Sequence, residues 1–252
     1  MKMYTTFKKW IPAKTWLMLW LLSACAAPER AEERQTEKPT EKKPVFTLLE
    51  PAQTSIDFAN NLDEDKYRNI VVYQYFYMGG GVAVGDINND GLSDLFFTGN
   101  QVANRLYLNK GNLQFEDITL LAGLRNQTRA SWCTGVTMAD INNDGWLDIY
   151  VCRSGNLQPE NRANLLYINN KDKTFTESAA RYGLNDPGYS VQATFFDYDQ
   201  DNDLDVFIVN HGMEYYGKAE LNAELKRDPY IADRLYRNDG GKFTDVSQQA
   251  GI

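Results

Sequence analysis

The stretch ADINNDGWLDIYV, residues 139–151, joins a short acidic loop to an apolar run. Oxygen-bearing side chains stand at alternate positions, Asp140, Asn142 and Asp144, and Gly145 and Asp148 follow them. The next residues, Ile-Tyr-Val, are typical of strands. The stretch therefore predicts a tight polar loop that leads directly into a β-strand.

The same pattern occurs in two more places, as GDINNDGLSDLFF from Gly85 and FDYDQDNDLDVFIV from Phe196. The leading aspartates, Asp86, Asp140 and Asp197, are 54 and 57 residues apart. Each loop is followed by a second shared block: NRLYLN from Asn104, NLLYIN from Asn164 and DRLYRN from Asp233. Both blocks recur in the same order, so the chain contains three copies of one unit, at residues 80–124, 134–184 and 191–252.

Each copy has the periodicity of strands, with short aliphatic and aromatic runs separated by Asn, Asp and Gly. About four strands fit into one copy, and four-stranded units that recur at this length indicate the blades of a β-propeller. The predicted fold is all-β. Tyrosines recur at one place in each copy and are predicted to pack in the core: Tyr107, Tyr167 and Tyr236.

The three loops share one spacing of oxygen donors, which suits a hard cation. Ca²⁺ takes roughly six to eight oxygen ligands, from carboxylates, amides and backbone carbonyls. The sixth position needs a sharp turn with positive φ, which Gly91 and Gly145 permit and which Asn202 tolerates. With the seventh residue contributing its carbonyl, the predicted ligands are Asp86, Asn88, Asp90, Leu92 and Asp94; Asp140, Asn142, Asp144, Trp146 and Asp148; and Asp197, Asp199, Asp201, Asp203 and Asp205.

Three other interpretations of the loops fit the sequence less well. A polar hairpin turn needs no metal, but the crowded carboxylates would then repel one another. An EF-hand requires Glu at the twelfth position, where this chain has Phe97, Val151 and Ile208. A catalytic pair of carboxylates needs separated pKa values in a cleft, so calcium is the favoured interpretation.

These blocks resemble FG-GAP-like or VCBS-type repeats, the blade units of calcium-binding propellers related in fold to the head of integrin α chains. The resemblance covers residues from about 80 to 252. It implies that each loop joins the first two strands of a blade and that calcium fixes this hairpin. It also implies binding or adhesion to an extracellular glycan or protein rather than catalysis. A carbohydrate-active enzyme and a structural subunit of a surface complex are the alternatives.

Closed propellers have more than three blades, and two explanations are open. The chain is an N-terminal fragment with an incomplete propeller, or residues 45–80, with the aromatic-rich run IVVYQYFYM, supply a degenerate blade of an open assembly. We favour the fragment.

The N-terminus has the pattern of an export signal, with lysines before the apolar run 16–22. Leu22-Ser-Ala-Cys25 resembles the lipobox of bacterial lipoproteins, which implies a signal peptide at 1–24 and acylation of Cys25. A plain secretory signal is the alternative. Residues 26–44 are rich in charge and lack large apolar side chains, so they are predicted to form a disordered tether to a domain at 45–252. The expected location is the outer membrane or the cell surface.

The charge of the chain restricts its partners. The full sequence has a net charge of −8, and removal of residues 1–24, which carry four lysines and no acid, lowers it to −12. A polyanion is poorly suited to nucleic acid or to anionic lipid. We therefore expect no nucleic acid partner, and membrane association through the lipid anchor alone.

Three further features carry predictions. His211 is the only histidine, so triads and zinc sites that need several histidines are excluded. It stands with Tyr215 and Tyr216 at the start of the longest insertion, as a candidate ligand-binding group or an ordinary loop histidine. Cys133 and Cys152 flank the second acidic loop, and both a disulfide and two free thiols are open. We predict no enzymatic activity.

Overall fold

The computed structural model describes residues 45–124, 131–212 and 228–252. The chain divides into two compact units, residues 1–47 and residues 48–252, and the first is described only at 45–47. The predicted signal peptide, Cys25, the tether, Tyr215 and Tyr216 lie outside the described residues. Within the described part, none of the helices has the length and hydrophobicity needed to span a bilayer.

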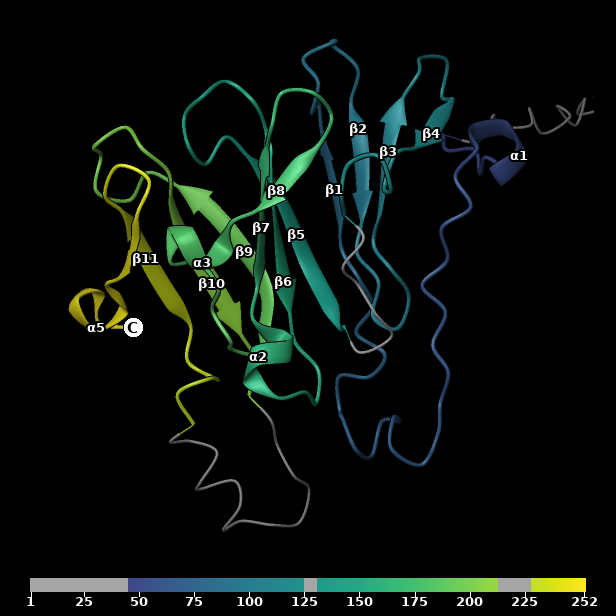
Figure 1. The fold of residues 1–252 in the computed structure, drawn as a ribbon. Coiled ribbons are helices and arrows are strands. Elements are labelled where there is room, and N and C mark those ends of the chain that lie inside the picture. The colour runs from purple at the N-terminus through teal and green to yellow at the C-terminus, as the bar shows by residue number, and fades with distance from the viewer. Residues whose placement is uncertain (1–44, 125–130, 213–227) are drawn as a thin grey trace, which may run out of the picture. The chain divides into compact units, whose positions relative to one another are not determined.

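Residues 48–252 contain three four-stranded antiparallel sheets, each formed by one of the sequence copies (Figure 1). We call them blades 1, 2 and 3. Blade 1 consists of β1 (Val82–Gly85), β2 (Asp94–Phe97), β3 (Arg105–Asn109) and β4 (Phe115–Asp117). Blade 2 consists of β5 (Cys133–Ala139), β6 (Asp148–Arg153), β7 (Leu165–Asn169) and β8 (Phe175–Glu177). Blade 3 consists of β9 (Ser190–Phe196), β10 (Asp205–Asn210), β11 (Arg234–Asn238) and β12 (Phe243–Asp245). Strands are paired in sequence order within each blade, which confirms the predicted all-β propeller units.

Four helices of four residues each lie in the described connections. They are α1 (Pro51–Thr54), α2 (Pro159–Arg162), α3 (Ala179–Tyr182) and α5 (Ser247–Ala250). The helices α3 and α5 follow the last strands of blades 2 and 3 and end at Gly183 and Gly251, with φ of 79° and 81°. Ser55 ends α1 in the same left-handed conformation, with φ of 63°. The segment before blade 1 thus has the turn that elsewhere closes a repeat.

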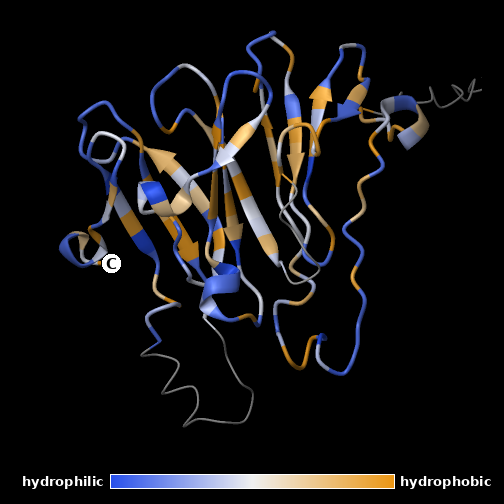
Figure 2. Ribbon diagram, in the orientation of Figure 1, coloured by the Kyte–Doolittle hydropathy of each residue, from blue (hydrophilic) through white to orange (hydrophobic). Residues whose placement is uncertain are grey.

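Alternation along β6 explains how the blades pack on one another. Ile149 and Val151 belong to a hydrophobic cluster with residues of blade 1. Tyr150 and Cys152 belong to a second cluster with residues of blade 3. Successive strand residues point to opposite faces, so blade 2 is buried on both sides. The hydropathy pattern in Figure 2 agrees, with apolar residues concentrated in the strands and polar residues in the loops.

The first strands of the three blades lie next to one another and are joined by threonine hydroxyls. Thr134 Oγ1 donates to the carbonyl oxygen of Ser190 at 2.7 Å, and Thr137 Oγ1 donates to that of Ala193 at 2.6 Å. Thr98, after β2, donates to the carbonyl oxygen of Thr134 at 2.5 Å. These bonds hold neighbouring blades in register.

Residues 45–80 form no strand, although all of them are described. Phe58 stacks on Phe97 with ring centroids 5.2 Å apart, and Tyr107 donates its hydroxyl to Asp57 at 2.9 Å. Further along, Tyr73 and Phe76 pack against Trp132. Residues 57–76 therefore cover blade 1 and reach blade 2. Since residues 45–80 contain no strand, the alternative in which they supply a degenerate blade is wrong.

Candidate metal centres

The three acidic loops each join the first two strands of a blade. We call residues 86–94, 140–148 and 197–205 loops 1, 2 and 3. Each loop ends with the aspartate that begins the second strand. In all three blades that aspartate is paired across the hairpin with the last residue of the first strand. All three loops lie at the same end of their blades (Figure 1).

The ninth-position aspartate of each loop is fully buried. Its carboxylate accepts two backbone N–H groups, one from the second loop residue and one from the asparagine that ends the third strand. The donors are Ile87 and Asn109 for Asp94, Ile141 and Asn169 for Asp148, and Tyr198 and Asn238 for Asp205, at 2.7 to 3.1 Å. This explains why the acidic loop and the L-Y-x-N block recur together, because one carboxylate joins them.

The first aspartate of each loop holds the turn itself. The carboxylate of Asp140 accepts the N–H groups of Asp144 at 2.9 Å and Gly145 at 2.7 Å. Asp86 and Asp197 accept the equivalent N–H groups in their loops. The sixth residues adopt the predicted positive φ, namely 83° at Gly91, 84° at Gly145 and 75° at Asn202.

The fifth-position aspartates Asp90, Asp144 and Asp201 accept the N–H of the seventh residue at 2.9 to 3.0 Å. The carbonyl oxygens of the seventh residues are predicted ligands and belong to Leu92, Trp146 and Asp203. Among the described residues, no hydrogen bond is donated to them. In loops 1 and 2 the third-position amide donates to the fifth-position carboxylate, from Asn88 to Asp90 at 2.9 Å and from Asn142 to Asp144 at 3.1 Å. The turn of each loop is thus held by hydrogen bonds from its backbone N–H groups to its own carboxylate oxygens.

Loop 3 brings its carboxylates closest together. Asp197, Asp199 and Asp205 each have a carboxylate oxygen within 4.8 Å of the others. Within the described ranges, no other three acidic, histidine or cysteine side chains meet this criterion. Loops 1 and 2 have an asparagine at the third position instead, so their donor sets mix carboxylate and amide oxygens. Both sets consist of the hard oxygen donors that Ca²⁺ prefers.

The charges of the loops perturb their carboxyl groups. Burial raises the pKa of Asp148 to about 6, and the charges of Asp144 and Asp140 add to this effect. The pKa of Asp94 is raised for the same reasons. Desolvation and the neighbouring charges of Asp201 and Asp205 also raise the pKa of Asp199. A bound cation would remove the repulsion that contributes to these shifts.

His211 lies at the opposite end of the blades and is only 8 % exposed. Its Nδ1 lies 3.1 Å from the carbonyl oxygen of Gly212 and donates to it. Its Nε2 lies 2.8 Å from Ser154 Oγ and 3.1 Å from the hydroxyl of Tyr73. Burial lowers the pKa of His211 and raises that of Tyr73 to about 12, so both are neutral near pH 7. The histidine joins blade 2, blade 3 and the segment before blade 1, in an arrangement that is structural rather than open to a ligand.

One residue near His211, the buried Arg162, is not predicted by the sequence patterns. Arg162 is 3 % exposed, and its guanidinium lies 3.9 Å from the ring centroid of Tyr189 and 4.8 Å from that of Tyr230. It also donates to the carbonyl oxygens of Pro187 and Leu157 at 2.7 and 2.6 Å. No repeated pattern marks this residue, and its partners are set by the fold.

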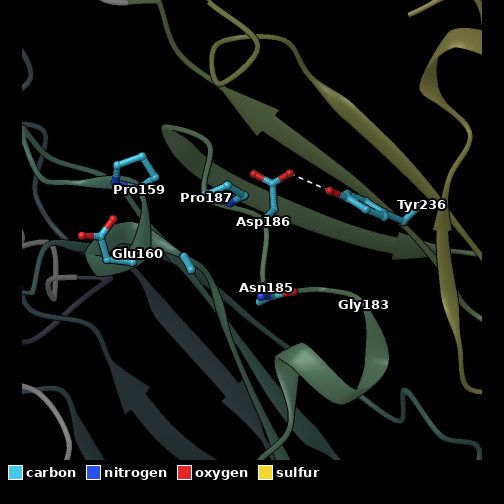
Figure 3. A pocket seen from close by; sticks show the side chains of 8 residues that line it. Pro159, Glu160, Gly183, Asn185, Asp186, Pro187 and Tyr236 are labelled. Atoms are coloured by element: carbon cyan, nitrogen blue, oxygen red, sulfur yellow. Dashed lines mark hydrogen bonds between the residues drawn. The ribbon is translucent and has the colours of Figure 1, made fainter.

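A shallow pocket of about 360 Å³ lies beside α2, and Figure 3 shows its lining. The hydroxyl of Tyr236 in blade 3 donates to Asp186 at 2.6 Å. In the same way, the hydroxyl of Tyr107 in blade 1 donates to Asp57, which precedes that blade. The recurring tyrosines are buried, as predicted, and two of them also anchor the segment before their blade. Because this contact occurs in more than one blade, the Asp186 side of the pocket has a structural role.

Cys133 and Cys152 are free thiols in this structure. Cys133 faces blade 1 and Cys152 faces blade 3, in different hydrophobic clusters. Thiols on opposite faces of one sheet point apart, so the geometry favours the alternative of two free thiols over a disulfide.

Comparison with known proteins gives two results. The FG-GAP-like repeat matches residues 78–151 and 155–208. Cartilage acidic protein 1 of Xenopus tropicalis is 35 % identical over 184 residues, which cover 67 % of this chain and 27 % of that protein. The proteins of the same name from Mus musculus and Homo sapiens are 32 % and 31 % identical, over 66 % and 67 % of this chain and 27 % and 26 % of their own length. The chain thus spans about a quarter of the length of these relatives.

Proposed function

Because this chain belongs to the FG-GAP-like repeat family, we propose that it is a binding module of an exported lipoprotein, braced by calcium. In this proposal each acidic loop holds one Ca²⁺, which stabilises the first hairpin of its blade. The role of the metal is structural, and the chain has no enzymatic activity.

The observation that carries the calcium proposal is the convergence of Asp197, Asp199 and Asp205 in loop 3, with oxygens within 4.8 Å of one another. Loops 1 and 2 have the same hydrogen-bonded turn and the same positions for their donors. The residues that would hold calcium are those at the first, third, fifth, seventh and ninth positions of each loop. Calcium supplies positive charge that offsets the repulsion between these carboxylates. Since it binds the folded chain, it adds stability by mass action.

The ligand-binding surface is proposed at the end opposite to the calcium loops. The second strands end and the third strands begin there, and the sequence segments between them differ in length, from 98–104 in blade 1 to 154–164 in blade 2 and 211–233 in blade 3. Variable loops on one face of a repeat protein are often its binding surface. The partner class is an extracellular glycan or protein, and the negative charge of the chain does not favour nucleic acid.

The test of the calcium proposal is a thermal unfolding experiment with and without excess chelator. We expect chelation to lower the melting temperature of the full chain. Asp144→Ala should lower it in calcium and have much less effect in chelator. Asp172→Ala is the matched control, since Asp172 is an exposed aspartate in the β7–β8 turn whose carboxylate, within the described ranges, accepts hydrogen bonds from Thr174 alone. Its effect should be the same in both conditions. Identical melting curves in calcium and in chelator would contradict the proposal.

The lipid anchor has a separate test. Cys25 lies outside the described residues, and its proposed acylation rests on the sequence LSAC. In a bacterial host that processes lipoproteins, the chain should fractionate with membranes and carry the mass of attached acyl chains. Cys25→Ser should release it into the soluble exported fraction, whereas Cys133→Ser should not. Equal fractionation of the parent and Cys25→Ser would contradict the anchor.

A further inference from the structure

Asn169, the last residue of β7, bonds a loop of the neighbouring blade, a contact that its counterparts Asn109 and Asn238 do not make with any described residue. Its side-chain Nδ2 donates to the carbonyl oxygen of Ile87, in loop 1 of the neighbouring blade, at 2.8 Å. It also donates to the carbonyl oxygen of Leu147, in its own loop 2, at 3.1 Å. The asparagine is 3 % exposed, so these bonds are shielded from water.

These bonds complete a short path between two carboxylates of different loops. Asp94 of loop 1 accepts the N–H of Ile87 at 3.0 Å. The carbonyl oxygen of Ile87 accepts a hydrogen bond from the side-chain Nδ2 of Asn169. The backbone N–H of Asn169 donates to Asp148 of loop 2 at 2.9 Å. Both carboxylates and Ile87 are fully buried. Two residues, Ile87 and Asn169, thus connect the two ninth-position aspartates through hydrogen bonds.

A second contact joins the tips of the same two loops. The side-chain Nδ2 of Asn89 donates to the carbonyl oxygen of Gly145 at 3.0 Å. This contact is exposed to water, which competes for it, so it is expected to hold the loops together less strongly than the buried bonds of Asn169. Both contacts connect loop 1 with loop 2.

Loop 3 lacks such a connection among the described residues. Asn238 occupies the position of Asn169 and donates its backbone N–H to Asp205 at 2.8 Å. Its side chain, however, donates to Leu204 of its own blade at 3.2 Å and to no residue of loop 2. Asn109 of blade 1 likewise bonds Ser93 of its own blade. Asn238 is thus a natural control for Asn169.

We propose that loops 1 and 2 bind calcium cooperatively, with Asn169 as the residue that couples them, and that loop 3 binds independently. This inference rests on the proposed calcium binding. A cation in loop 1 fixes Asp94 and hence Ile87, which orients Asn169 and the N–H that holds Asp148. The second cation then finds its buried carboxylate already ordered, and this gives a favourable and reciprocal coupling between the two sites.

Trp146 in loop 2 provides a reporter for the test. Terbium ion is the probe, since it replaces calcium at oxygen sites and luminesces when a nearby tryptophan is excited. The other described tryptophan, Trp132, lies just before β5, at the opposite end of blade 2 from the loop. In the full chain, displacement of terbium by calcium establishes that the loops bind the metal. Absence of tryptophan-sensitised, calcium-sensitive luminescence overturns the calcium proposal itself.

The coupling is measured by disabling one loop at a time in buffer with enough salt to screen surface charge. Asp90→Ala in loop 1 should weaken terbium binding at loop 2 by about fivefold or more, the lower end of typical couplings, and should make the titration less steep. Asp201→Ala in loop 3 removes the same charge and should leave loop 2 unchanged. Equal effects of the two variants, or no effect of Asp90→Ala while loop 2 still binds, overturn the coupling and leave the calcium proposal intact.

The role of Asn169 follows from a double-mutant cycle. In an Asn169→Ala background, Asp90→Ala should no longer weaken loop 2, while in an Asn238→Ala background it should weaken loop 2 as in the parent. An undiminished effect in Asn169→Ala would show that the coupling runs through space or through Asn89, and would exclude Asn169 as the coupling residue. Circular dichroism in saturating calcium checks folding. If Asn169→Ala does not fold, Asn169→Ser, which shortens the side chain and keeps the backbone N–H, takes its place.

Discussion

The two ends of the blades close their hairpins in different ways. At the acidic end, one buried carboxylate per blade accepts N–H groups from the loop and from the third strand, and the arrangement is the same three times. At the opposite end one contact also recurs, because the first residue of each third-strand block, Asn104, Asn164 or Asp233, accepts the backbone N–H of a residue at or just after the end of the second strand at 2.7 to 2.9 Å. The contacts of His211 and Arg162 at that end, however, occur once each. Repeated bonds thus coincide with repeated sequence at both ends, whereas the connections beyond Asn104, Asn164 and Asp233 differ from blade to blade. Because the proposed calcium ligands all lie at the acidic end, the change in stability caused by a substitution there should depend on calcium, whereas the change caused by a substitution at the opposite end should not.

The largest effect is expected at Asp148. Asp148→Ala leaves the buried N–H groups of Ile141 and Asn169 without an acceptor, and should lower the free energy of unfolding by about 3 kcal/mol or more. Asp148→Asn keeps an acceptor oxygen and should cost less. Urea unfolding in calcium and in chelator measures both. A loss confined to calcium would show that Asp148 acts through the metal alone and not through these bonds.

The opposite end is tested by His211→Ala. The substitution removes the buried Nε2 acceptor near Ser154 and Tyr73, whose hydroxyls are left with their bond to each other at 3.1 Å, and should cost about 2 kcal/mol. Because His211 lies far from the acidic loops along its blade, the loss should be equal in calcium and in chelator. Unequal losses would mean that the two ends are energetically coupled and would break the distinction drawn between them.

A smaller effect is expected at the sixth loop position. Gly145→Ala places a side chain at φ of 84°, which should cost about 1 to 2 kcal/mol through backbone strain alone, since a Cβ there meets no neighbouring atom. Asn202→Gly in loop 3 should instead change the free energy of unfolding by less than about 0.5 kcal/mol, because asparagine already tolerates this conformation. Chemical unfolding in chelator measures the free energy of this backbone strain without any contribution from metal binding. A large gain from Asn202→Gly would show that loop 3 is strained in the parent.

The smallest net effect is expected from pH in chelator. The pKa of Asp148 is raised to about 6 in the folded chain, so the folded state holds this proton more tightly than the unfolded state. Its contribution to stability is present below about pH 4, the ordinary aspartate value, and is lost as the pH rises through about 6. Asp65, Asp90 and Asp172, whose pKa values are lowered, oppose this trend. Melting temperatures across this range should fall less with rising pH in Asp148→Asn than in the parent, and equal slopes would contradict the assignment to Asp148.

Much of the fold could be predicted from the sequence because the repeated blocks carry their own physical explanation. The acidic loop, the strand after it and the L-Y-x-N block give the order of the strands and the turn geometry at Gly91, Gly145 and Asn202. The ninth-position aspartate and the third-strand asparagine also recur in all three copies, which marks both as important to the unit. Their role as hydrogen-bonding partners required the structure.

Other features could not be predicted, because they depend on residues far apart in sequence and present only once. Nothing near His211 in the sequence indicates its partners, since Tyr73 lies 138 residues away. The faces of Cys133 and Cys152 depend on the irregular pairing between Cys133 and Val136, where the register shifts. A shift of one residue exchanges the two faces of a strand, so sequence reasoning left the disulfide open.

The turn at Ser55 has a consequence for how this protein can be divided into modules. Helix α1, the left-handed Ser55 and the Asp57 that receives Tyr107 match α3, Gly183 and the Asp186 that receives Tyr236. The third strand of a blade is therefore anchored by the segment that precedes the blade, so the structural module begins well before the first strand. An engineered single blade, or a graft of this blade into another scaffold, should start near Leu48 rather than at Val82, or Phe97 and Tyr107 would lose their partners.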